Sequence, residues 1–150
     1  MNVFGKEISG REALANFLAI FWPPMLVFML HVCLFRIWNA YFYIPWIDIP
    51  MHFLGGLSMA YSLSAVLTFL QERRAISRLD LGVQLLLVFT SVATIAVLWE
   101  FMEFSQDHIF NMNTQISLAN TMQDLLMGML GAAALLGLKN IPSWFFCNLR

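Results

Sequence analysis

The stretch WIDIPMHFLGG, residues 46–56, places an acid, an imidazole and two glycines at the start of a long uncharged segment. Asp48 and His52 are four residues apart, so on a helix they lie one turn apart on the same face. No formal charge occurs from Phe53 to Gln71. A run of this length is typical of a membrane span, where ionisable groups are expensive and indicate function. The sequence therefore predicts a membrane helix with an acid–histidine pair at one end.

Composition places the whole chain in a membrane. Of its 150 residues, 60% are apolar and 11% are charged, and the mean hydropathy is +0.73. These values exclude an ordinary soluble globule. The net charge of −1 and the lack of a basic block also exclude nucleic-acid binding, which needs a concentrated positive patch. We expect an all-α integral membrane protein with a single domain over residues 1–150.

Uncharged runs divide this domain into a bundle of four transmembrane helices. The first uncharged run, residues 13–35, would extend about 35 Å as a helix, which is enough to cross the hydrocarbon core. It contains Pro23-Pro24, which should kink it. An interfacial lead, residues 1–12, precedes the bundle, and an aromatic tail, SWFFCNLR, follows it. The predicted helices are residues 13–35, 49–71, 81–108 and 118–138.

The positive charges predict the orientation of the bundle. If the N-terminus is cytoplasmic, seven of the 8 Lys and Arg residues lie inside and only Arg36 lies outside. Both termini are then cytoplasmic. The same topology gathers ionisable groups at the outer helix ends: His31, Asp48, His52, Glu100, Glu103, Asp107, His108 and Asp124.

Small residues should let these helices pack closely. Gly55 and Gly56 on the second helix, with Gly128 and Gly131 on the fourth, would allow close approach of backbones. Carboxylates drawn together at low dielectric need protons or a metal ion to neutralise them. The metal hypothesis uses these five side chains, with His31 or His108 as a further nitrogen ligand: Asp48, His52, Glu100, Glu103 and Asp124. Such ligands suit a divalent metal, namely zinc, manganese or iron.

A purely structural interpretation of the same residues stays open. Asp48, Asp107 and His108 lie near helix ends, where headgroups and water can solvate them. His31 and His52 can serve as hydrogen-bonded packing residues. Glu100 and Asp124 should lie deeper and are harder to explain in this way.

Three motifs resemble the VanZ-like and YjdF-like group of small bacterial inner-membrane proteins. They are Asp48-Ile-Pro-Met-His52-Phe-Leu-Gly-Gly, Trp99-Glu-Phe-Met-Glu103, and Thr121-Met-Gln-Asp124 followed by Gly131-Ala132. The resemblance covers about residues 46–134 and implies a helical bundle in a bacterial plasma membrane, with cell-envelope substrates. The chain departs from the YjdF-like pattern before Asp124, where Asn113, Thr114 and Asn120 replace the usual acids.

Three functions therefore stay open. The first is a metal-dependent enzyme acting on a lipid or lipid-linked envelope substrate near the extracytoplasmic face, where a bound metal activates water against an ester or phosphoester. The second is a proton- or ion-coupled transporter or channel subunit. The third is a structural or assembly subunit of a membrane complex. Membrane lipids are the expected partners, and the glycine faces are compatible with a homo-oligomer or a larger complex.

Overall fold

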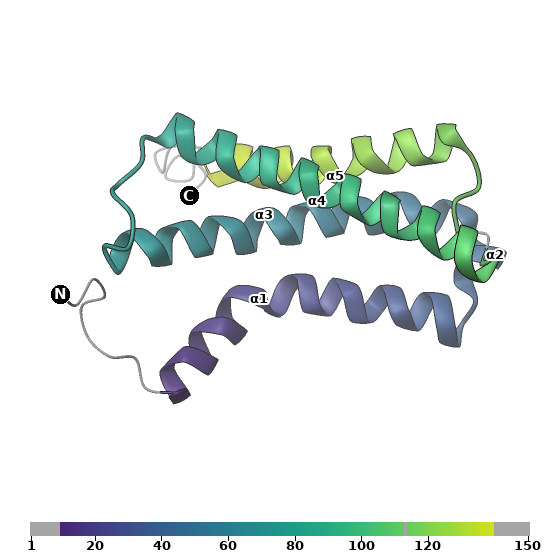
Figure 1. Cartoon of the computed structure of the whole chain (residues 1–150), viewed down its shortest axis with the longest axis horizontal. Helices are drawn as coiled ribbons and strands as arrows, with labels where there is room; N and C mark the ends of the chain where they lie inside the picture. The colour runs from purple at the N-terminus through teal and green to yellow at the C-terminus, as the bar shows by residue number, and fades with distance from the viewer. Residues whose placement is uncertain (1–9, 113, 140–150) are drawn as a thin grey trace, which may run out of the picture.

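The computed structural model describes residues 10–112 and 114–139, and all secondary structure in this part of the chain is helical. Four long helices run side by side, and short helical turns connect the first two (Figure 1). In chain order the elements are α1 (Gly10–Val32), the π-helical turn η1 (Cys33–Ile37), α2 (Ala40–Tyr43), the 3-10 turn η2 (Pro45–Ile47), α3 (Asp48–Glu72), α4 (Leu81–Phe110) and α5 (Leu118–Lys139).

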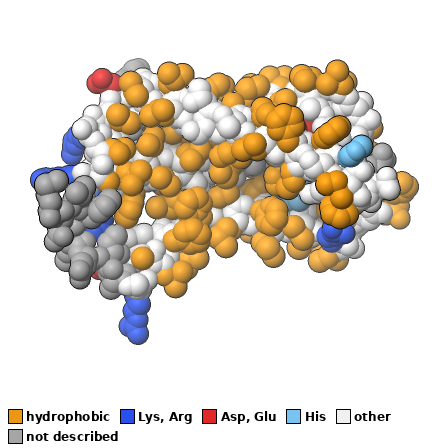
Figure 2. All heavy atoms as spheres, in the orientation of Figure 1, with side chains coloured by type: hydrophobic (Ala, Val, Ile, Leu, Met, Phe, Trp, Pro, Cys, Tyr) orange, Lys and Arg blue, Asp and Glu red, His pale blue; other side chains and the backbone are white. Residues whose placement is uncertain are grey.

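The four predicted membrane spans are confirmed. The segments long and apolar enough to cross a bilayer are Gly10–Ile37, Pro45–Glu72, Leu81–Phe110 and Leu118–Leu138. Figure 2 shows hydrophobic side chains over the middle of the visible face, with Lys and Arg mainly at one end. Residues 10–12, expected to belong to the interfacial lead, are the first turn of α1 instead. The rest of that lead and the aromatic tail lie outside the described residues.

The tandem prolines bend α1, as predicted, and turn its N-terminal part away from α3 (Figure 1). Pro24 has no N–H, so the helix supplies no i+4 donor to the carbonyl of Ile20. Ser62 of α3 replaces that donor, because its hydroxyl donates to the Ile20 carbonyl oxygen at 2.7 Å. Ser62 is completely buried. The bend and the α1–α3 contact are therefore parts of one arrangement, which the hydropathy pattern did not reveal.

Glycines bring α3 and α5 into backbone contact next to the predicted site. A methyl group at Gly56 would overlap the backbone of Gly128, and one at Gly131 would overlap the carbonyl of Phe53. The prediction of close packing holds for these glycines. It is wrong for Gly55, whose added methyl group would meet no atom within 4 Å. Successive helical residues point about 100° apart, so only one glycine of the pair can face α5.

The bundle has an apolar core in the half far from the predicted site. This core comes from α3, α4 and α5, whereas α1 has no fully buried residue and packs mainly on α3. The other half contains the end of α1, the start of α3, the end of α4 and the start of α5, as the sequence predicted (Figure 1). The orientation of these ends relative to the membrane stays a prediction. The buried core residues are Ala60, Val88, Val92, Ala132 and Leu136.

Candidate metal centre

The acid–histidine pair opens α3. Asp48 is the first residue of the helix, where the unpaired N–H groups and the helix dipole favour a carboxylate. Pro50 lies in the same first turn, where its missing N–H is tolerated. One turn later, Nε2 of His52 lies 3.3 Å from Oδ1 of Asp48. The predicted i, i+4 pair is therefore formed.

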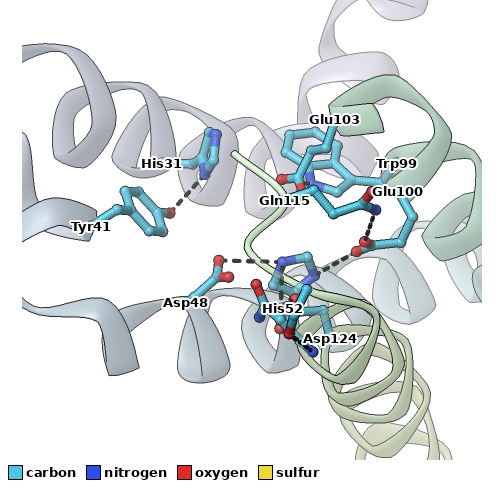
Figure 3. Close-up of polar contacts among 11 residues, drawn as sticks. His31, Tyr41, Asp48, His52, Trp99, Glu100, Glu103, Gln115 and Asp124 are labelled. Atoms are coloured by element: carbon cyan, nitrogen blue, oxygen red, sulfur yellow. Dashed lines mark hydrogen bonds and ion pairs between the residues drawn. The ribbon is translucent and has the colours of Figure 1, made fainter. Parts of the chain in front are cut away.

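Acids from two other helices meet the same imidazole (Figure 3). Glu100 of α4 places Oε1 3.9 Å from Nδ1 of His52, and Asp124 of α5 places Oδ1 3.9 Å from Nε2. Two groups of ligand atoms, each within 4.8 Å of one another, share this histidine. They are Asp48, His52 and Asp124, and His52, Glu100 and Glu103. All five residues of the predicted set therefore converge around His52.

Two carboxylate oxygens of this cluster are buried without a hydrogen-bond partner. Glu100 is 5% exposed and Asp124 is 2% exposed, and the unpaired atoms are Glu100 Oε1 and Asp124 Oδ1. Their other oxygens accept hydrogen bonds from the side-chain amides of Gln115, at 3.4 Å, and Asn120, at 2.7 Å. A buried carboxylate oxygen with no donor carries a large desolvation penalty. A proton or a cation between it and the imidazole would remove that penalty.

Glu103 is held by its own helix. Nε1 of Trp99 donates to Oε1 of Glu103 at 2.8 Å, an i, i+4 pair that directs the carboxylate along the α1 side of the cluster (Figure 3). The ring of His31 meets the indole of Trp99 edge-on, with centroids 5.2 Å apart. Because Trp99 donates to Oε1 of Glu103, the second carboxylate oxygen of Glu103, Oε2, accepts no hydrogen bond from this indole.

Neither of the other two histidines joins the cluster. Nδ1 of His31 is 2.7 Å from the hydroxyl of Tyr41, on the opposite side of the site from Asp124 (Figure 3). Burial, together with the nearby Asp48 carboxylate, raises the pKa of Tyr41, so its hydroxyl stays protonated and can donate to His31. His108 is exposed and stacks on Phe104. As further ligands, His31 and His108 are therefore not supported.

Asp107 also turns away from the site. Its Oδ1 accepts from the backbone N–H and hydroxyl of Thr114, both at 2.6 Å, and its Oδ2 accepts from the N–H of Gln115 at 2.7 Å. Glu100, Glu103 and Asp107 are spaced i, i+3 and i+7 on α4, so they share one face of the helix, but Asp107 has a different task from the other two. Asp107 fixes the α4–α5 connection, and that connection carries Gln115 to Glu100.

An apolar cavity leads to the cluster. Its volume is about 540 Å³, it lies between α1, α3 and α4, and Asp48 and His52 form part of its wall. Sequence reasoning missed this cavity and three residues that hold the acids: Trp99, Gln115 and Asn120. Two of them carried a detectable signal, because Trp99 precedes Glu103, and Asn120 precedes Asp124, by one helical turn.

The spacing of the cluster suits a small divalent ion. Metal–ligand bonds of about 2.1 Å in a tetrahedral site imply about 3.4 Å between ligand atoms. Nε2 of His52 lies 3.3 Å from Asp48 Oδ1 and 3.9 Å from Asp124 Oδ1, and the three ligand atoms lie within 4.8 Å of one another, so an inward movement of the carboxylates would bring them to this spacing. The donors are nitrogen and carboxylate oxygen, as zinc, manganese and iron prefer.

Comparison with known proteins agrees with this architecture. Residues 14–141 match the family described as predicted membrane protein (DUF2238). The chain belongs to this family. DUF2238 membership and the four spans together make it a multi-pass membrane protein in contact with lipid. No curated protein and no solved structure matches the chain.

Proposed function

We propose that this DUF2238 protein is a metal-dependent enzyme of the bacterial plasma membrane that acts on a lipid or lipid-linked envelope substrate. One observation carries the proposal. Buried, unpaired carboxylate oxygens of Glu100 and Asp124 approach opposite nitrogens of His52. No lysine or arginine among residues 10–112 and 114–138 forms an ion pair with either acid. A divalent ion is the partner that suits several carboxylates at once.

The two nitrogens of His52 divide the five residues by role. A neutral imidazole ligates through one nitrogen and donates its N–H from the other, often to a carboxylate. We assign Nε2 to the metal, together with Asp48 and Asp124, because Asp48 and His52 border the cavity from which a substrate would enter. Nδ1 then donates to Glu100, which positions the ring. Glu103 adds negative charge beside this pair.

The proposed chemistry is hydrolysis of an ester or phosphoester. A divalent metal in this position supplies Lewis-acid activation of water and of the scissile group. The three protein ligands leave further coordination positions for water and substrate, which distinguishes a catalytic site from a closed structural one. The resemblance to VanZ-like and YjdF-like proteins supports an envelope substrate, and the positive-inside count supports a site near the outer face.

A transporter has less support, because the half of the described bundle beyond the site is mainly apolar. Ala60, Val92 and Ala132 belong to the apolar core that fills the other half. The hydroxyls of Ser62 and Ser64 on α3 donate to backbone carbonyls. A proton or ion path needs a chain of polar groups, and these hydroxyls are already engaged.

Elemental analysis of the full-length protein, purified in detergent without added chelator, tests the metal site. We expect stoichiometric zinc, manganese or iron in the wild type. Asp124→Asn should abolish it, whereas Glu100→Gln should lower metal affinity by about 10–100-fold, as loss of an orienting carboxylate does. His108→Ala is the matched control and should retain the metal, because this histidine is exposed and outside both ligand groups.

The proposal fails if the wild type holds no stoichiometric metal after purification and after incubation with each of the three ions. The carboxylates would then be neutralised by protons, and the cluster would be a packing network of the kind expected for a structural or assembly subunit. Equal metal content in the wild type, Asp124→Asn and Glu100→Gln would also refute it, because the bound metal would lie elsewhere.

A further inference from the structure

Along α3, the apolar cavity has about the length of one bilayer leaflet. Its lining residues on α3 extend from Asp48 to Met59, a rise of about 16 Å along the helix. Half of a hydrocarbon core about 30 Å thick is about 15 Å. The cavity therefore reaches from the helix ends that carry the charged cluster to about the middle of the membrane.

The cavity wall is open towards lipid on the side of α1. Phe17, Met25 and Phe28 line it, yet they remain 51%, 48% and 50% exposed. Because α1 packs mainly on α3, the α1–α4 side lacks a continuous helix contact. Lipid is the molecule present at this depth, so a lipid chain can enter sideways without crossing a polar layer.

Polarity in the cavity is concentrated at one end. Asp48, His52 and His31 lie together there. Ser58, the other polar side chain of the lining, is engaged within its helix, since its hydroxyl donates to the carbonyl of Gly55 at 2.9 Å. The remaining lining is aliphatic or aromatic, apart from three glycines. This division matches a molecule with one polar end and one long apolar chain.

We propose that the cavity binds one hydrocarbon chain of a phosphate-bearing lipid, with the phosphate at the Asp48–His52 end. This inference rests on the proposed function for the polar end, because a divalent ion held by acids and His52 would attract the phosphate. The chain end rests on the cavity alone. The protein would thus select lipids by the chain that fills the space between α1, α3 and α4.

Gly55 offers a direct way to fill the cavity. It borders the cavity, and a Cβ built on it meets no atom within 4 Å, so Gly55→Leu can be introduced without a clash at Cβ and adds volume beside the cavity. Gly82→Leu is the matched control, because Gly82 also has open space around it and lies outside the cavity lining, in the first turn of α4. Both changes place the same side chain on a helix at a position where an added Cβ meets no atom within 4 Å.

The experiment uses the full chain in vesicles of phosphatidylglycerol, part of which carries a photoreactive diazirine at the end of one acyl chain. After illumination, peptide mapping should find adducts on the deep lining residue Met59. Gly55→Leu should reduce these adducts at least about tenfold, the scale of overpacking a filled space. Gly82→Leu should leave them unchanged. Unlabelled phosphatidylglycerol in excess should compete.

Two outcomes would overturn the chain site. Adducts confined to lipid-facing side chains outside the cavity, such as Leu86 and Leu126, would show ordinary contact with the bilayer. Deep adducts that Gly55→Leu leaves unchanged would refute the assigned cavity. The metal content of the same samples separates this inference from the proposed function. Deep adducts in a protein without metal would support the chain site and refute the metal-dependent enzyme. Bound metal without deep adducts would support the metal site and refute the chain site.

Discussion

Replacing Ser62 with alanine should destabilise the bundle by removing the contact that ties α3 to the bend in α1. The hydroxyl of Ser62 donates to the Ile20 carbonyl at 2.7 Å. That carbonyl has no i+4 donor in its own helix, because residue 24 is proline. Neither water nor lipid reaches the fully buried Ser62 position to replace the lost hydroxyl.

The expected loss is about 1–2 kcal/mol. An orphaned buried acceptor costs about 1–3 kcal/mol, whereas hydrogen bonds between membrane helices contribute about 0.6 kcal/mol on average and at most about 1.7. We expect Ser62→Ala near the upper limit for membrane helices, because the carbonyl it leaves has no alternative donor. Ser64→Ala is the control. Its hydroxyl donates at 2.7 Å to the carbonyl of Ala60, which the helix already satisfies, so less than about 0.5 kcal/mol should be lost.

The assay is reversible unfolding in mixed micelles, followed by circular dichroism at increasing mole fraction of dodecyl sulfate. Pro24→Ala completes a double-mutant cycle, because alanine restores an N–H that can bond to Ile20. In that background Ser62→Ala should cost less by about 1 kcal/mol. Equal losses for Ser62→Ala and Ser64→Ala, or strict additivity with Pro24→Ala, would refute the explanation of the bend.

Three further predictions concern the helix contact, the α4–α5 connection and Tyr41. Gly56→Ala should destabilise the protein by about 3 kcal/mol in the same unfolding assay, because the added methyl group overlaps the Gly128 backbone. Gly55→Ala is the control and should be neutral or slightly stabilising. Similar effects of the two substitutions would contradict the assigned packing. Asp107→Asn should speed amide hydrogen exchange at residues 114–115 and leave the metal content unchanged; lost metal would instead place Asp107 in the site. The raised pKa of Tyr41 means that above its ordinary value of 10.0 the unfolded chain loses this proton while the folded protein keeps it, so stability falls as pH rises. Tyr41→Phe should therefore reduce the decline in melting temperature between about pH 9 and about pH 11, and an unchanged decline would refute the assignment.

The sequence predicted the helices well because lipid leaves few alternatives. A backbone without water must satisfy its own hydrogen bonds, so each uncharged run of sufficient length becomes a helix. The end of α5 nearest the site was also predictable in kind: Ser117 caps it by accepting from the N–H of Asn120 at 3.2 Å, as a serine before an apolar helix should. The end of α4 was placed two residues early, because the helix continues until Asn111 adopts a left-handed conformation with φ of 52°.

Spacing and depth predicted which residues form the cluster around His52, but they did not predict which neighbouring ionisable residues stay outside it. Helical periodicity places Glu100, Glu103 and Asp107 on one stripe. Which of them reaches His52 depends on the α4–α5 connection, whose N–H groups attract Asp107 away. Gly55 and Gly56 show the same limit, because only the rotation of α3 decides which glycine meets α5. Local sequence contains neither of these tertiary facts.

The close contact between α3 and α5 prevents the acids around His52 from moving apart. Gly56 and Gly131 allow the two backbones to touch just below the site, and this contact fixes His52 of α3 against Asp124 of α5. Repulsion between the carboxylates therefore cannot be relieved by moving the helices apart, because that movement would open the glycine contact. A positive charge between the acids relieves the repulsion without any such movement. The helix α1 takes no part in this constraint, so it is free to form the wall through which a lipid enters.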